Sequence, residues 1–265
     1  MGLVGVLCVM SLHVEAQYMT HRGKVRPNNE DALLVMDNVI QEEEMVEPVV
    51  ANFEGNSFIF AVADGMGGHK AGEVASRLAL NYLASNWLGI QSVESLDRCV
   101  QDMHSEIVKE ARKSSSMSNM GTTLAGILIH DQTVWVFNVG DSRVYGAQAD
   151  ALWQLSKDQS LVGALVEEGS ITLEQARSHP LRGVLLECLG GGLKEGNVQV
   201  IIREVNLNEY DAFLICTDGL TDALSNEVID HCLFQSKENT LSCLFEKYME
   251  AGAADNMSAV LVCLC

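Results

Sequence analysis

The sequence predicts an α+β fold, with strands and helices grouped along the chain instead of alternating. Apolar residues make up 48% of the 265 positions, which is enough for one large domain with a substantial core. Short apolar runs bounded by Gly, Asp and Asn indicate buried strands in both halves of the chain. The predicted order along the chain is strands, two long helical stretches, more strands and further helices. This order favours α+β layering over repeated βαβ units.

The first half predicts an opening pair of strands, a connection and two helices. The strands cover 15–18 and 32–36, and we expect the acidic, proline-containing segment 37–56 to be an exposed connection. Apolar residues at helical spacing predict a helix after the glycine turn at 65–68, with Ala75, Ala79 and Leu83 on its buried face. A second helix is predicted over about 93–113.

The second half predicts strands, an irregular excursion and a helical C-terminal part closed by a strand. The predicted strands are 123–129, 133–139, 143–147, 198–205, 212–217 and 257–263. The predicted helices are 161–169, 173–178, 225–232 and 240–251. The excursion comprises the two short helices at 161–178 and the segment that follows them.

The charge balance excludes some partners. The chain has 17 basic and 36 acidic residues, a formal net charge of −19, which argues against nucleic acid or an anionic membrane as a partner. No apolar stretch is long enough to span a bilayer. Residues 1–13 lack the basic start and cleavage site of a secretory signal and are treated as an N-terminal extension without an assigned role. We expect a cytoplasmic monomer.

Eight cysteines occur in the chain, without a Cys-x-x-Cys pair or a Cys/His spacing that suits zinc. Most of them lie in apolar segments, so we predict reduced core residues, as in a cytoplasmic protein. Those in or near such segments are Cys99, Cys188, Cys216, Cys232, Cys243 and Cys263.

The most informative stretch is Asp64-Gly65-Met66-Gly67-Gly68, directly after the apolar run 58–63. The run is typical of a buried strand, and the glycines after it indicate a sharp turn. A carboxylate and free main-chain carbonyls therefore meet at a strand end, the oxygen ligands that hard cations prefer.

Other strand ends carry carboxylates as well. Asp141 and Asp218 follow predicted strands, whereas Glu30 and Asp255 precede them. In an antiparallel sheet the exit of one strand lies beside the entrance of its neighbour, so these side chains are expected to converge. Taken singly, each is as well explained as a turn residue. Together they would repel one another unless cations were bound.

Six short segments occur in a fixed order. They are Arg26-Pro27-Asn28-Asn29-Glu30-Asp31-Ala32, Ala63-Asp64-Gly65-Met66-Gly67-Gly68, Gly121-Thr122-Thr123, Val139-Gly140-Asp141-Ser142-Arg143, Thr217-Asp218-Gly219-Leu220 and Asp255-Asn256-Met257-Ser258. In this order, from about Val14 onward, they resemble the metal-dependent serine/threonine protein phosphatases of the type 2C or PPM family. Met66, where eukaryotic members usually have His, resembles the bacterial branch.

The resemblance implies a central antiparallel β-sandwich flanked by helices on both outer faces. It implies a phosphatase domain over 14–265, with a flap at about 156–185. The implied activity is metal-dependent hydrolysis of phosphoserine and phosphothreonine by a metal-bridging water. The implied partners are phosphorylated proteins, including Ser/Thr kinases and their substrates. The alternative is a pseudophosphatase that binds metal or phosphoprotein without turnover, but the complete set of expected site residues favours the enzyme.

The resemblance also assigns roles. Asp64 bridges two Mn²⁺ or Mg²⁺ ions, the carbonyl of Gly65 holds one of them, and Asp218 and Asp255 complete the other. Glu30 binds through a coordinated water. Asp141 matches a residue that, with Asp218, holds a third and weaker ion in bacterial relatives. The flap position that contributes in some relatives is Gly183 here, which offers only a carbonyl.

Two arginines are given different roles. Arg26 is the candidate phosphate clamp, because its planar guanidinium matches two phosphate oxygens and it stands four residues before Glu30, as in the family. Arg143 is expected to pair with a local carboxylate. Met66 cannot donate a proton, so we expect a metal-bound water to act as the general acid, with His69 as the alternative.

Overall fold

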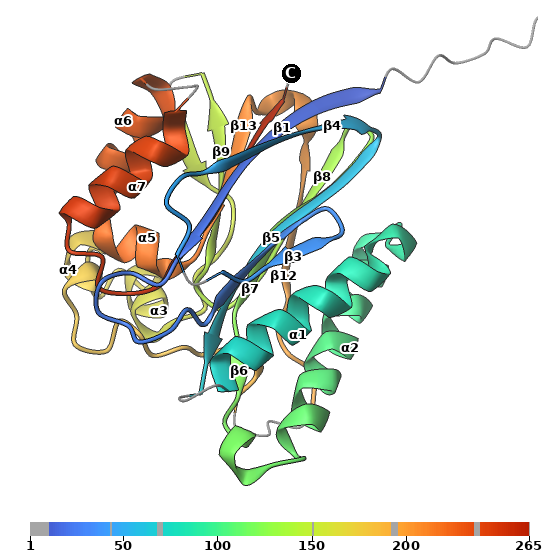
Figure 1. Ribbon diagram of the computed structural model, residues 1–265, viewed down its shortest axis with the longest axis vertical. Coiled ribbons are helices and arrows are strands. Elements are labelled where there is room, and N and C mark those ends of the chain that lie inside the picture. Colours follow the sequence, from blue (N-terminus) through green and yellow to red (C-terminus); the bar gives the residue numbers. More distant parts are fainter. Residues whose placement is uncertain are drawn as a thin grey trace, which may run out of the picture.

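Two antiparallel sheets stand at the centre of the computed structural model, with helices outside them (Figure 1). The structure describes residues 11–42, 44–67, 71–149, 151–191, 196–235 and 239–264. The α+β fold predicted from the sequence is confirmed. Within the described ranges, no helix combines the length and the apolar character needed to cross a lipid bilayer.

The first sheet has the strand order β10-β9-β13-β14-β1-β4. Its neighbours pair antiparallel throughout, and the last strand of the chain lies beside the first. Its strands are β1 (Leu12–His21), β4 (Val49–Gly55), β9 (Arg143–Gln148), β10 (Ala151–Gln154), β13 (Ala212–Cys216) and β14 (Met257–Leu264).

The second sheet has the order β11-β6-β5-β7-β8-β12, with β2 paired to both β5 and β3. Its strands are β2 (Asp31–Val35), β3 (Asn38–Ile40), β5 (Ser57–Met66), β6 (Gly121–Thr122), β7 (Leu124–His130), β8 (Thr133–Val139), β11 (Leu189–Gly190) and β12 (Ile201–Asn206). Apolar residues from both sheets, among them Phe60, Ile127 and Phe213, fill the space between them.

Helices pack on the outer face of each sheet. The helices α1 (Ala71–Asn86) and α2 (Val93–Ala111) cover the second sheet and share a core with β5 and β7. The helices α5 (Asp218–Ala223), α6 (Asn226–Gln235) and α7 (Thr240–Glu250) cover the first. Two short helices, α3 (Leu161–Glu167) and α4 (Leu173–Arg177), lie in the excursion between β10 and β11. Figure 1 shows the two main helical groups on opposite sides of the sheets.

The predicted opening pair of strands is wrong. The segment 15–18 lies in β1, between β14 and β4 of the first sheet, whereas 32–36 lies largely in β2, in the second sheet. The connection between them crosses from one sheet to the other, so these two strands do not pair with each other.

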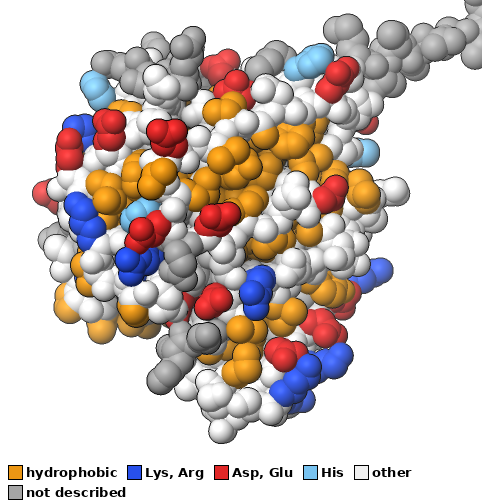
Figure 2. All heavy atoms as spheres, in the orientation of Figure 1, with side chains coloured by type: hydrophobic (Ala, Val, Ile, Leu, Met, Phe, Trp, Pro, Cys, Tyr) orange, Lys and Arg blue, Asp and Glu red, His pale blue; other side chains and the backbone are white. Residues whose placement is uncertain are grey.

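The segment 37–56 is not only a connection, because it contains β3 and β4. In β4 exposed residues alternate with half-buried ones, a pattern typical of an edge strand and too polar to be recognised as a strand from sequence. Val49 and Val50 at its start are exposed. Figure 2 shows hydrophobic side chains across the middle of this face, where Figure 1 draws β1 and β4.

The prediction that the cysteines are reduced is wrong for one pair. Cys232 of α6 and Cys243 of α7 form a disulfide, with their Cα atoms 5.6 Å apart. The two residues are separated by 11 positions, and only the packing of one helix on the other brings them together. Cys99 and Cys216 are buried thiols, as predicted.

Candidate functional site

Asp64 and Asp31 face each other where β5 ends and β2 begins. They are partners in the β2–β5 register, and the Gly65 amide donates a hydrogen bond of 3.2 Å to the Glu30 carbonyl. A Cβ at Gly65 would lie 2.1 Å from the carbonyl oxygen of Gly72 at the start of α1, so only glycine allows this close approach. The exit of one strand and the entrance of its neighbour therefore meet, as predicted.

Two threonines fix the backbone of Asp64. The Asp64 amide donates to Thr123 Oγ1 at 3.0 Å, and its carbonyl accepts from the Thr123 amide and from Thr122 Oγ1, both at 2.9 Å. Thr123 Oγ1 lies 2.7 Å from Ser142 Oγ, beside Asp141. The Gly-Thr-Thr segment thus links the strand end that carries Asp64 to the one that carries Asp141.

The Asp-Gly sequence suggested an open turn at Asp218. In the structure Asp218 is instead the first residue of α5. A carboxylate at this position is favoured by the partial positive charge of a helix N-terminus. The preceding Thr217 joins the sheets. Its amide donates to the Ser258 carbonyl in the first sheet at 3.0 Å, and its hydroxyl donates to Asp31 Oδ2 in the second at 2.8 Å.

Arg26 and Asp255 form an ion pair, with Nη2 and Oδ2 2.5 Å apart. Both side chains are more than a third exposed, and they come from opposite ends of the chain. The Asp255 carboxylate raises the pKa of Arg26, mainly through this hydrogen bond. Glu30 lies nearby, and partial burial raises the pKa of its carboxyl group although Arg26 opposes the shift.

Four carboxyl groups, those of the buried Asp31 and the half-buried Asp64, Asp141 and Asp218, lie close enough to perturb one another. Burial raises the pKa of Asp31 to about 8 and that of Asp218 to about 6. Burial, followed by repulsion from neighbouring carboxylates, raises the pKa of Asp64 and Asp141 well above its ordinary value. Asp64 and Asp218 are also hydrogen-bonded to each other. Asp31 was noted at a strand entrance but not predicted as a site residue.

The chemistry of this cluster fits hard divalent cations. The ligand atoms are oxygens only, and Oδ1 of Asp218 and of Asp31 are buried without a hydrogen-bond partner in the structure. Among the described residues, no three acidic, histidine or cysteine side chains point at one spot in ligand geometry. In the structure the Asp255 carboxylate is paired with Arg26.

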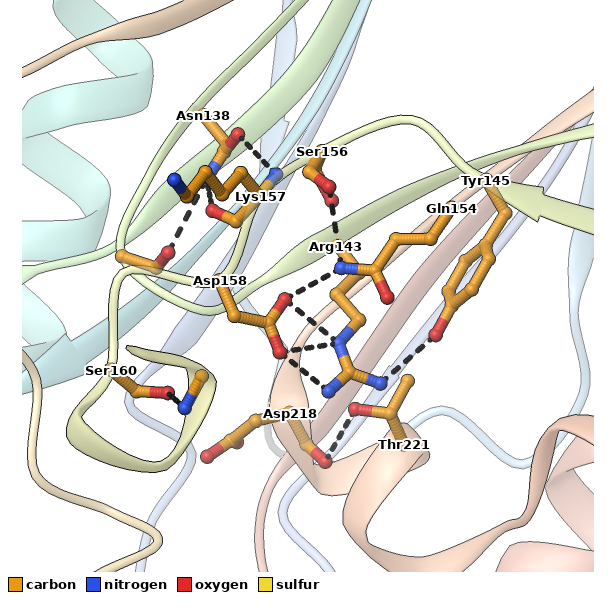
Figure 3. Close-up of polar contacts among 12 residues, drawn as sticks. Asn138, Arg143, Tyr145, Gln154, Ser156, Lys157, Asp158, Ser160, Asp218 and Thr221 are labelled. Carbon is orange, nitrogen blue, oxygen red and sulfur yellow. Dashed lines mark hydrogen bonds and ion pairs between the residues drawn. The ribbon is translucent and has the colours of Figure 1, made fainter. Parts of the chain in front are cut away.

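The predicted pairing of Arg143 with a local carboxylate is confirmed. Its Nε lies 3.0 Å from both oxygens of Asp158 and its Nη2 lies 2.6 Å from Oδ2 (Figure 3). A further nitrogen donates to the Tyr145 hydroxyl at 3.1 Å. Figure 3 also shows the Thr221 side chain directed at Asp218. The Thr221 hydroxyl donates a hydrogen bond of 3.3 Å to the Asp218 carbonyl. Arg143 is therefore held by both Asp158 and Tyr145.

A cleft of about 880 Å³ adjoins the carboxylate cluster. It runs between α3 and α4 on one side and α5 and α6 on the other, and it reaches Asp141 and Asp218. Arg182 crosses it to Asp222 of α5 at 3.1 Å. Gly183 is exposed and offers no side chain to the cluster. His69, the alternative general acid, lies outside the described residues.

The chain is similar to proteins of known class. The model of the family described as protein phosphatase 2C matches residues 49–264. The serine/threonine phosphatase stp of Listeria innocua is 35% identical over 260 residues, which cover 94% of this chain and 95% of that protein. The serine/threonine protein phosphatase PstP of Mycobacterium tuberculosis is 35% identical over 245 residues, which cover 91% of this chain and 43% of PstP.

Solved structures resemble the fold over nearly its whole length. Serine/threonine phosphatase Stp1 from Staphylococcus aureus superposes with a TM-score of 0.80 at 29% identity, over 94% of both chains. The catalytic domain of PstP in complex with two manganese ions gives a TM-score of 0.74 at 30% identity, over 96% of this chain and 99% of that one.

Proposed function

This chain belongs to the protein phosphatase 2C family, and from that premise we propose that it hydrolyses phosphoserine and phosphothreonine in proteins in a metal-dependent reaction. The observation that carries the proposal is the meeting of Asp64, Asp218 and Asp141 at one end of the two sheets, with Arg26 and Asp255 beside them. The pseudophosphatase alternative has no observation in its favour.

The proposed ligands are the residues predicted from the sequence. Asp64 and the Gly65 carbonyl would hold one ion, and Asp64, Asp218 and Asp255 the other, with Glu30 binding through water. When bound, two divalent ions supply an activated water and neutralise the phosphoryl charge. The solved PstP catalytic domain contains two manganese ions, which supports a site for divalent cations, and Mn²⁺ or Mg²⁺ is the proposed cofactor. A third ion at Asp141 and Asp218 remains part of the proposal.

Arg26 is proposed to bind the phosphoryl group through its guanidinium fork. In the structure this fork is held by Asp255, so the arginine is already oriented toward one of the proposed metal ligands. Binding of a phosphate would exchange one anionic partner for another. Because the Arg26 side chain is already partly exposed to solvent, the phosphoryl group can reach it there.

The boundaries and partners are proposals on the same basis. We assign 14–265 to the phosphatase domain and about 156–185 to its flap, because α3 and α4 line the cleft that reaches Asp218. Phosphorylated proteins are the proposed substrates, including Ser/Thr kinases. A monomeric state stays a prediction. So does a cytoplasmic location, and the Cys232–Cys243 disulfide weakens the cysteine argument for it.

The test is phosphate release from a phosphothreonine peptide, with Mn²⁺ and with a chelator. Turnover should require the metal, and Asp64→Asn should lower it by roughly two or more orders of magnitude, because both ions lose a ligand. Undiminished turnover after exhaustive chelation would exclude the proposed chemistry. Tight binding of Mn²⁺ and phosphopeptide without any turnover would instead favour the pseudophosphatase.

A further inference from the structure

One buried asparagine holds both ends of the loop that carries Arg26. Asn256 Nδ2 donates to the carbonyl of Arg22 at 2.9 Å and to that of Asn28 at 3.0 Å. Its Oδ1 accepts from the Glu30 amide at 2.9 Å. The side chain amide thus uses both donors and its acceptor on one segment, and Asn256 itself is 6% exposed.

Other contacts also hold the loop, among them hydrogen bonds from Arg22 Nη1 to the Pro27 carbonyl at 3.4 Å and from Lys24 Nζ to the Met249 carbonyl at 2.8 Å. Residues 24–27 are exposed and contain no regular secondary structure. The Lys24 amide donates to the Ala253 carbonyl at 2.8 Å, and Arg26 contacts Asp255 through its side chain. These contacts lead to the same turn that Asn256 belongs to. The backbone position of Arg26 therefore depends in part on the segment 253–256.

The backbone of Asn256 connects to two proposed metal ligands. Its amide donates to Oδ1 of Asp255 at 2.8 Å. Its carbonyl packs against the first turn of α5, where a Cβ at Gly219 would lie 1.8 Å from it, next to Asp218. Neither contact involves the amide side chain of Asn256. Removing that side chain thus removes its hydrogen bonds to the carbonyls of Arg22 and Asn28 and to the Glu30 amide, while these two backbone contacts remain.

We propose that Asn256 is a positioning residue for phosphate binding, which acts through Arg26 by clamping the loop 22–30 against the turn that presents Asp255. The inference rests on the proposed function in that Arg26 is the phosphate clamp. Neither Asp nor Ala reproduces it: ionised Asp has no donors for the carbonyls of Arg22 and Asn28, and Ala leaves both carbonyls and the Glu30 amide without this partner.

The experiment is a double-mutant cycle between Asn256→Ala and Arg26→Ala. Two quantities are measured in saturating Mn²⁺: the KM for a phosphothreonine peptide, and the calorimetric Kd for inorganic phosphate, which needs no turnover. Asn256→Ala alone should weaken both by roughly tenfold. In the Arg26→Ala background it should add less than about twofold, because the group through which it acts is already gone. The Kd for Mn²⁺ should change by less than about threefold, since the backbone contact to Asp255 remains.

Asn138 provides a matched control. It is fully buried, and its side chain also makes three hydrogen bonds to backbone, with Gly140 at 3.3 Å and with the carbonyl and amide of Lys157 at 2.7 and 3.2 Å. Asn138→Ala removes a comparable network away from the Arg26 loop. Any effect it has on phosphate binding should be equal with and without Arg26.

The cycle separates the possible outcomes. Equal effects of Asn256→Ala in both backgrounds mean that Asn256 does not act through Arg26, and the inference is then wrong. A loss of Mn²⁺ binding as large as the loss of phosphate binding also overturns it. If Asn256→Ala does not fold, Asn256→Ser, which keeps one hydroxyl donor, replaces it in the same cycle. A wild-type protein that binds phosphate without turnover would refute the proposed function. The double-mutant cycle measured by the Kd for inorganic phosphate would then still decide the inference about Asn256.

Discussion

Nη2 of Arg26 lies 2.5 Å from Oδ2 of Asp255, so the proposed phosphate clamp and a proposed metal ligand are partners of each other. Each neutralises the other while neither holds its own ligand. Arg26→Ala should therefore weaken phosphopeptide binding by roughly 10- to 100-fold, the equivalent of one lost charge-assisted contact. It should leave the calorimetric affinity for Mn²⁺ equal or slightly higher. A large loss of Mn²⁺ affinity would contradict the assigned role.

Mn²⁺ should stabilise the folded protein. The buried carboxylates repel one another, and an ion that binds only the folded state at a hundredfold excess over its Kd contributes about 2.7 kcal/mol. For a chain of this size we expect Tm to rise by roughly 5–10 °C on adding Mn²⁺ to chelated protein. Scanning fluorimetry measures the rise, and Asp64→Asn should reduce it. Identical melting curves in both conditions would speak against a metal cluster in the folded state.

Stability in chelator should fall as the pH rises. The folded-state pKa of Asp218 is about 6 and that of Asp31 about 8, against an ordinary value of 3.8. The folded protein thus binds more protons than the unfolded chain between about pH 4 and pH 8, and the free energy of unfolding declines across this window. A Tm lower by at least about 2–4 °C at pH 8 than at pH 5 is expected. Saturating Mn²⁺ should flatten the slope, and a Tm that rises over this range in chelator would refute the assignment.

Reduction of the Cys232–Cys243 disulfide should destabilise the protein. The bridge closes a loop between residues separated by 11 positions, which corresponds to about 2–4 kcal/mol of unfolding free energy. A reductant should lower the Tm of the wild type. Cys243→Ser should have the lower Tm already and lose its sensitivity to reductant. Thiol titration of unreduced, denatured protein that detects every cysteine would show that the bridge does not form.

The strand ends were predictable because their signal is local. An apolar run followed by an adjacent Asp and Gly, in either order, indicates both a buried strand and the exit where its carboxylate stands, and Asp64 and Asp141 lie near the ends of β5 and β8. Pairing across the fold carries no such local signal. The sequence gives no reason for β1 and β2 to lie in different sheets, and strands that follow each other in the chain most often pair.

Residues that act through others were missed for a related reason. Asp31 and Asn256 stand next to Glu30 and Asp255, and a polar residue at a strand entrance is ordinarily explained as part of a turn. The three backbone contacts of Asn256 join segments more than 200 residues apart in sequence. The Cys232–Cys243 bridge likewise depends on how α6 packs on α7, which no spacing rule describes.

The position of β14 between β1 and β13 sets the order in which this protein becomes active during synthesis. Asp255 and Asn256 directly precede β14, so a chain still on the ribosome can have made Arg26, Asp64 and Asp218 without a complete site. We expect phosphatase activity only after β14 has left the exit tunnel and entered the sheet. A nascent chain stalled after Ala254 should accordingly release no phosphate.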